Sequence, residues 1–125
     1  MGGFIAVGIG AALGAWLRWG LGLWLNPVFP VLPYGTLAAN LLGGYLVGLA
    51  LAFFLTNPDL SPEWRLFLVT GFLGGLTTFS TFSAEVFTQM ARGQIGWAML
   101  TAGLHLFGSL TMTALGVWSA RFLRG

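Results

Sequence analysis

The chain has 125 residues, of which 57% are hydrophobic and only 6% are charged. A soluble domain of this length has too small an interior to hide so much apolar surface, so the composition predicts an integral membrane protein. The absence of cysteine excludes disulfides, thiolate metal sites and cysteine nucleophiles, and five scattered arginines with no lysine exclude a nucleic-acid patch or a polybasic lipid anchor.

About 20 helical residues cross the hydrocarbon core of a bilayer. The chain therefore has room for four spans, and we predict one all-α transmembrane domain over residues 1–125. The first span is expected over about 4–25. Because the N-terminus lacks a basic n-region and its apolar run exceeds a signal h-region, this span is expected to be retained.

Small residues mark a packing face in the first span. Gly10 and Gly14 are four residues apart, a spacing that lets another helix backbone approach closely. Arg18 continues the same stripe. Its long side chain suits a boundary position from which the charge reaches the interface, but it equally suits the mouth of an anion pathway.

The second span, expected over about 34–55, follows a proline-rich linker over 26–33. Thr36 and Asn40 lie four residues apart and therefore on one helix face. An asparagine at membrane depth needs a polar partner. It serves either as a hydrogen-bonding contact between helices or as a contact to a ligand in a pore.

The third span, expected over about 64–91, is too long for one straight crossing. Ser61 and Pro62 predict its helix start. Three glycines at 71, 74 and 75, followed by Thr77 and Thr78, predict a break near 74–78. A helix that stops inside lipid leaves carbonyls unpaired, which is tolerated only where protein, water or an ion satisfies them. Such breaks commonly form ion sites.

Two phenylalanines share a helix face just after this break. Phe79 and Phe82 are three residues apart, and Ser83 continues their face. They serve either as packing residues or as anion contacts, because the edge of an aromatic ring carries partial positive charge. Glu85 is the only acid well away from a loop. It suits a proton carrier, an arginine partner or an interfacial residue.

The fourth span, expected over about 95–120, carries a polar stripe at four-residue spacing: Thr101, His105, Ser109 and Thr113. Such a stripe should face protein or water rather than lipid. No catalytic triad motif, paired carboxylates or phosphate-binding loop is present, which argues against an enzyme. Hydroxyls, an amide and ring edges instead favour an anion pathway or a channel.

Arginine placement gives a weak prediction of orientation. With four spans, Arg65, Arg121 and Arg124 fall on one side and Arg18 and Arg92 on the other. Because three against two is a small bias, the chain could insert both ways and form an antiparallel dimer.

Four segments together resemble one known family. They are Gly74-Gly75-Leu76-Thr77-Thr78-Phe79-Ser80-Thr81-Phe82-Ser83 followed by Glu85, then 35–40, 14–18 and 105–109. Over its whole length the chain closely resembles the Fluc (CrcB) family of fluoride channels.

The resemblance implies an antiparallel homodimer with two fluoride pores that passively export fluoride across a prokaryotic cell membrane. It implies a vestibule arginine at Arg18. It also implies a structural sodium ion at the dimer centre, held by the backbone carbonyls of Gly74 and Thr77 from both subunits. Under this interpretation the pore residues are Asn40, Phe79, Phe82, Ser83, His105, Ser109 and Thr113.

Three alternatives remain open on the residues alone. One is a fluoride/proton antiporter and another a small dual-topology multidrug exporter, both with Glu85 as the proton carrier. The third is a membrane scaffold without transport activity, in which the polar stripes only join helices.

Overall fold

The computed structural model describes residues 1–124, so Gly125 of the predicted domain lies outside the described residues. Within that range the chain is helical and contains no strand. Four helical segments are long and apolar enough to cross a membrane: Gly2–Val28, Tyr34–Thr56, Pro62–Ala91 and Ile95–Leu123. The prediction of an all-α chain with four membrane-crossing helices is confirmed.

The first two segments are continuous helices. Helix α1 spans Gly2–Leu25 and ends in a 3-10 turn, η1, over Asn26–Val28. Helix α2 spans Tyr34–Thr56. Its start is fixed by Asn26, whose side-chain oxygen accepts hydrogen bonds from the backbone N–H groups of Gly35, at 2.7 Å, and Thr36, at 3.2 Å.

The third segment consists of several pieces. Helix α3 spans Pro62–Arg65, a π-helical stretch, η2, spans Leu66–Leu73, α4 spans Gly74–Leu76, and α5 spans Phe79–Ala91. The fourth segment is the single helix α6, Ile95–Arg124. Gly93 makes the turn between α5 and α6. Its φ of +76° is a left-handed backbone conformation that residues other than glycine rarely adopt.

Residues 77 and 78, here called the extended pair, separate α4 from α5. Thr77 has φ −85° and ψ 152°, and Thr78 has φ −145° and ψ 120°. The Thr77 N–H and hydroxyl both donate to the Leu73 carbonyl, at 3.0 and 2.8 Å, and this closes α4. The Thr78 hydroxyl accepts from the Thr81 N–H at 3.1 Å, so it caps the start of α5.

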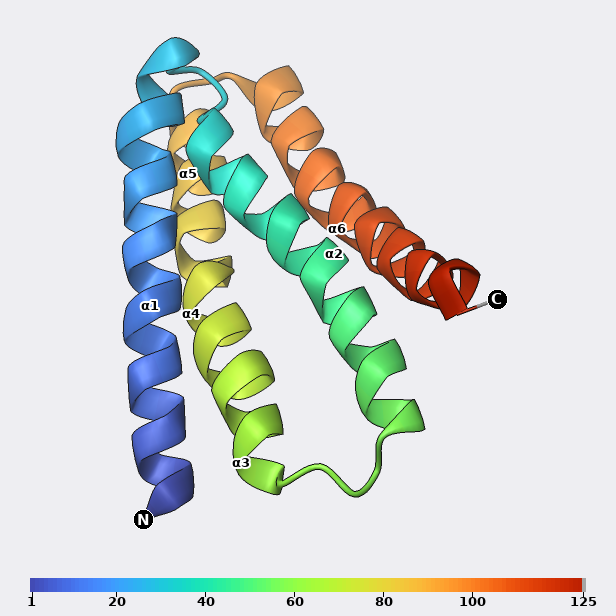
Figure 1. Cartoon of the computed structure of the whole chain (residues 1–125). Coiled ribbons are helices and arrows are strands. Elements are labelled where there is room, and N and C mark those ends of the chain that lie inside the picture. Colours follow the sequence, from blue (N-terminus) through green and yellow to red (C-terminus); the bar gives the residue numbers. More distant parts are fainter. Residues whose placement is uncertain (125) are drawn as a thin grey trace.

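The helices form two pairs. Helix α1 lies alongside the α3–α4 column, and α2 crosses diagonally to run beside α6 (Figure 1). The N-terminus and the 57–61 loop lie at one end of the bundle, and the η1 linker and the α5–α6 turn lie at the other (Figure 1).

Glycines allow both pairs to pack closely. A Cβ added to Gly14 would overlap the Phe72 carbonyl on η2, and one added to Gly48 would overlap the Thr113 carbonyl on α6. Gly116 faces the Tyr45 carbonyl across the same interface. Helices can approach at this distance only where both surfaces are built from small residues.

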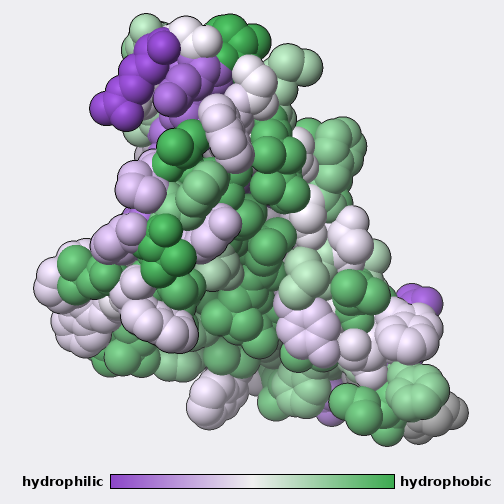
Figure 2. All heavy atoms as spheres, turned by 90° about the horizontal axis from the view of Figure 1, so that it is seen from above, coloured by the Kyte–Doolittle hydropathy of each residue, from purple (hydrophilic) through white to green (hydrophobic). Residues whose placement is uncertain are grey.

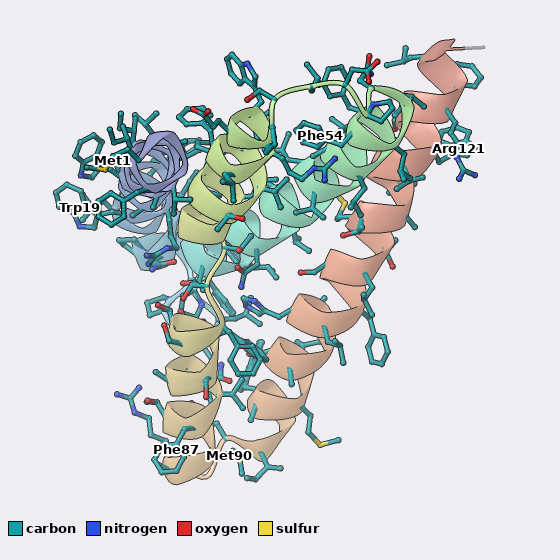
Figure 3. The ribbon with its side chains drawn as sticks, turned by 90° about the horizontal axis from the view of Figure 1, so that it is seen from below. Met1, Trp19, Phe54, Phe87, Met90 and Arg121 are labelled. Carbon is teal, nitrogen blue, oxygen red and sulfur yellow. The ribbon has the colours of Figure 1, made fainter. Side chains whose placement is uncertain are left out.

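The outer surface is apolar, as a lipid-facing surface requires. Trp19, Phe87 and Met90 point away from the bundle, whereas Phe54 lies between helices (Figure 3). Seen from the end that carries the η1 linker, the surface is largely hydrophobic, with hydrophilic atoms gathered mainly at one edge (Figure 2).

Candidate functional site

Asn40 joins α2 to the extended pair and to α6. Its Oδ1 accepts from the Thr78 N–H at 2.7 Å, and its Nδ2 donates to the Thr78 carbonyl at 3.1 Å. The same Nδ2 lies 2.9 Å from Nδ1 of His105. All three residues are buried. A single amide thus satisfies both backbone polar groups of Thr78, which the helices leave unpaired.

A cavity of about 320 Å³, here called the central cavity, opens beside this network. Six of the seven predicted pore residues line it, and Thr77, Thr78, Leu106 and Leu110 complete the lining. The six are Asn40, Phe79, Phe82, His105, Ser109 and Thr113. Residues from α2, α5 and α6 that are far apart in sequence therefore share one site, although Ser83 is exposed and does not line it.

Aromatic rings form one wall of the central cavity. Phe79 and Phe82 meet edge to face, with ring centroids 5.6 Å apart, and the Phe82 ring lies 4.7 Å from that of His105. Phe79 is 78% exposed on the surface of the single chain. The wall offers positively polarised ring edges to any group inside.

The hydrogen-bond donors in the cavity are not equally free. Both hydrogens of the Asn40 amide are used, on Thr78 and His105. The Thr113 hydroxyl donates within the protein, toward the carbonyls of Gly44 at 2.9 Å and Ser109 at 3.0 Å. The Nε2 of His105 is buried and has no hydrogen-bond partner among the described residues.

The extended pair also releases backbone carbonyls. In a continuous helix the Thr78 N–H would donate to Gly74 and the Thr81 N–H to Thr77. Here these donors bind the Asn40 side chain and the Thr78 hydroxyl instead. The Gly74 and Thr77 carbonyls have therefore lost their helical partners, and Gly74 lies on the exposed surface of the chain.

Arg18 reaches this region from α1. Its Nε donates to the Gly75 carbonyl at 3.0 Å, and the side chain lines a second pocket, of about 270 Å³, with Thr36, Thr78 and Thr81. This structural contact of Arg18 with the Gly75 carbonyl is one that the sequence analysis did not anticipate.

Comparison with known proteins identifies the family of the chain. The family model for CrcB-like protein, Camphor Resistance (CrcB), matches residues 5–117. The chain belongs to the CrcB family.

Several curated relatives match the CrcB chain over nearly its whole length. A protein of Cupriavidus metallidurans is 64% identical over 121 residues, which cover 97% of this chain and 96% of the relative. One from Thiobacillus denitrificans is 61% identical, covering 97% and 98%, and one from Pseudomonas putida is 60% identical, covering 97% and 95%. Each of these relatives is named "Fluoride-specific ion channel FluC".

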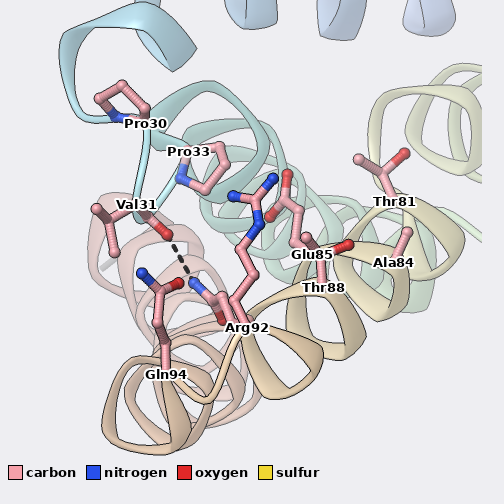
Figure 4. Close-up of a pocket in the computed structure, with 10 residues that line it drawn as sticks. Pro30, Val31, Pro33, Thr81, Ala84, Glu85, Thr88, Arg92 and Gln94 are labelled. Atoms are coloured by element: carbon pink, nitrogen blue, oxygen red, sulfur yellow. Dashed lines mark hydrogen bonds between the residues drawn. The ribbon is translucent and has the colours of Figure 1, made fainter.

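A third pocket of the CrcB chain surrounds Glu85. Its Oε2 accepts from the Thr36 hydroxyl at 2.6 Å, and the carboxylate lines a pocket of about 290 Å³ together with Arg92 and Gln94 (Figure 4). Figure 4 shows the side chain of Arg92 extending toward Glu85, but the two form no ion pair within the described range. Glu85 is therefore held by a hydroxyl.

Sequence reasoning missed two residues that position this region. Gln89 is buried and donates from Nε2 to the Val31 carbonyl at 2.7 Å, which ties the proline-rich linker to α5 (Figure 4). Asn26 caps α2, as described above. Nothing in the sequence indicates either partner, because Asn26 lies eight residues before the start of α2 and Gln89 lies 58 residues from Val31.

Proposed function

We propose that this chain is a fluoride-selective passive channel that exports cytoplasmic fluoride. The observation that carries the proposal is the central cavity, which combines the Asn40–His105 network, the two phenylalanine rings and the α6 hydroxyls at membrane depth. The printed names of the relatives, which describe fluoride-specific ion channels, support the same function.

The chemistry of the cavity suits a small, strongly hydrated anion. Fluoride can leave water only where donors replace its hydration shell. The Ser109 hydroxyl supplies such a donor, and the edges of Phe79 and Phe82 add weaker positive contacts. Weak ring contacts also avoid a deep trap, because conduction requires that the ion can leave as well as enter.

The proposal includes an antiparallel homodimer with two pores. Exposure of Gly74 and Phe79, which flank the extended pair in sequence, supports it, because a second copy could cover them. Nearly balanced arginines on the two sides would permit both orientations. The chain would then act as a multi-pass protein of the prokaryotic cell membrane.

A structural sodium ion belongs to the same proposal. Backbone carbonyls suit a hard cation, and those of Gly74 and Thr77 have lost their helical donors. Two copies would supply four such oxygens around one Na⁺, which would join the subunits and would not itself be transported.

A proton-coupled antiporter or exporter that uses Glu85 is not favoured. The relatives are named as ion channels, and Glu85 lies outside the set of residues that line the central cavity.

Arg18, which lines the neighbouring pocket, is proposed to attract fluoride toward the cavity.

Fluoride efflux from K⁺-loaded proteoliposomes, measured with a fluoride electrode, tests the function. We expect efflux that depends on valinomycin and is lost in Phe82→Ile. Efflux that ignored valinomycin but followed a pH gradient would replace the channel with an antiporter. No efflux from a folded dimer would reject transport.

A further inference from the structure

The single histidine of the chain has two ring nitrogens in different surroundings. His105 is only 5% exposed. Its Nδ1 lies 2.9 Å from the Asn40 amide nitrogen, and its Nε2 is buried without a partner among the described residues. Which nitrogen carries the proton therefore decides what the ring can offer to the central cavity.

The orientation of the Asn40 amide fixes that proton. A backbone N–H can only donate, so the Asn40 atom 2.7 Å from the Thr78 N–H must be the oxygen. A carbonyl can only accept, so the atom 3.1 Å from the Thr78 carbonyl must be the nitrogen. Both contacts reject a flipped amide, and the atom that faces His105 is therefore an NH₂ group.

An NH₂ group facing Nδ1 requires that Nδ1 accept the hydrogen bond. A neutral imidazole that accepts at Nδ1 carries its one proton on Nε2. A doubly protonated ring would set an N–H against an N–H at 2.9 Å, so the network excludes it as well. His105 thus presents a buried N–H donor, and a buried donor is destabilising unless something accepts from it.

A second unpaired group lies one helical turn away. The side chain of Thr101 is 0% exposed, and its hydroxyl has no partner among residues 1–124. Thr101 precedes His105 by four residues on α6 and shares its face. Because helical side chains lean toward the N-terminus, the imidazole leans over the turn that carries Thr101.

We propose that Asn40 holds His105 in the Nε2–H tautomer, and that this N–H and the Thr101 hydroxyl together bind one small anion. The ligand class is a hard monatomic anion; that it is fluoride rests on the function proposed above. The site would extend the anion path one turn beyond the central cavity, to a residue that does not line that cavity.

Nitrogen NMR of the whole dimer labelled with ¹⁵N-histidine tests the tautomer directly, because one histidine gives one pair of ring signals. Above a pH of about 8, where an imidazole is uncharged, we expect the proton on Nε2. Fluoride should shift the Nε2–H signal, and equimolar chloride should not. A proton on Nδ1, or an Nε2–H signal that fluoride leaves unchanged, overturns the proposal.

Thr101→Val tests the second donor, because valine keeps the shape of threonine without the hydroxyl. We expect half of the fluoride-induced shift to require about three- to tenfold more fluoride, the change expected for one lost hydrogen bond. Thr101→Ser should restore the wild-type midpoint. Thr111→Val, the same change on the exposed side of α6, is the matched control and should leave it unaltered. An unchanged midpoint in Thr101→Val removes Thr101 from the site.

Efflux from the same preparations separates this inference from the proposed function. A wild-type protein that conducts fluoride but shows the Nδ1–H tautomer overturns the inference and leaves the channel intact. A protein that does not conduct overturns the channel, whereas the tautomer is still read from the spectrum. A shift that is equal for fluoride and chloride shows an unselective site and rejects the assigned ligand class.

Discussion

The Nε of Arg18 donates to the Gly75 carbonyl at 3.0 Å, across 57 residues of sequence. Gly75 belongs to the last turn of α4, where carbonyls have no further helical N–H to accept from. The cation therefore binds the negative, C-terminal end of α4. This contact adds a charged hydrogen bond to the glycine-mediated packing of α1 against the segment that carries the extended pair.

Removing this guanidinium should destabilise the chain. Arg18→Met keeps the apolar stem but leaves the Gly75 carbonyl unpaired. Because hydrogen bonds to charged groups contribute about 1.5–3 kcal/mol, we expect a loss of about that size, measured as thermal unfolding of the detergent-solubilised protein. Arg121→Met, an exposed arginine on α6, is the matched control. Equal unfolding temperatures for the two variants would contradict the structural role of Arg18.

Two glycines on α6 give a second prediction, in which the same glycine-to-alanine substitution lowers the stability of the fold at one position and raises it at the other. At Gly116 an added methyl would overlap the Tyr45 carbonyl of α2, whereas at Gly103 nothing lies within 4 Å. Gly116→Ala should therefore destabilise the fold by about 1–3 kcal/mol. Gly103→Ala should stabilise it by about 0.5–1 kcal/mol through the lower helix propensity of glycine. Thermal unfolding of both variants measures the difference, and the same sign for both would contradict the α2–α6 interface.

The polar stripe on α6 shows how far the site could be predicted from the sequence. Periodicity alone placed Thr101, His105, Ser109 and Thr113 on one face, because helical spacing determines which residues are neighbours. Periodicity cannot say which hydroxyls are already paired. Thr113 donates to a carbonyl of α2, and Ser83 faces away from the cavity although it follows Phe82. Such facts depend on how two helices cross, which the pattern within one helix does not contain.

The pairing of Arg18 with Gly75 illustrates the same limit. A glycine pair followed by two threonines indicates that a helix is weakened there, and the sequence also indicates that the freed carbonyls need partners. It does not identify the partner, because the crossing of α1 over α4 decides which donor comes within reach. Interpretation of Arg18 from sequence therefore stayed between a boundary residue and a pathway residue.

Glu85→Gln separates a passive channel from a proton-coupled antiporter. The amide oxygen of glutamine can still accept from the Thr36 hydroxyl, so the contact at 2.6 Å is kept while the titratable proton is lost. For a channel we expect the valinomycin-dependent fluoride efflux rate to stay within about threefold of wild type, less than the loss of one hydrogen bond would produce. Thr36→Val, which removes the same contact from the other side, shows how much the contact itself matters. Abolished efflux in Glu85→Gln alone would support proton coupling.

Sodium should stabilise the assembled protein if the Gly74 and Thr77 carbonyls hold it. A ligand that binds only the folded state raises stability by mass action, by about 1.4 kcal/mol for each tenfold rise in its concentration above the dissociation constant. We expect the unfolding temperature to rise with Na⁺ at constant ionic strength and to stay flat with N-methylglucamine, which is too large for a carbonyl cage. Size-exclusion chromatography should show the dimer weakening in sodium-free buffer.

Because backbone oxygens cannot be mutated, the side-chain control is Thr77→Val, which keeps the carbonyl but loses the hydroxyl bond to Leu73. That variant should lose stability at every sodium concentration and keep the sodium slope of the wild type. If the wild type responds to sodium and the slope disappears in Thr77→Val, the hydroxyl rather than the carbonyl binds the ion.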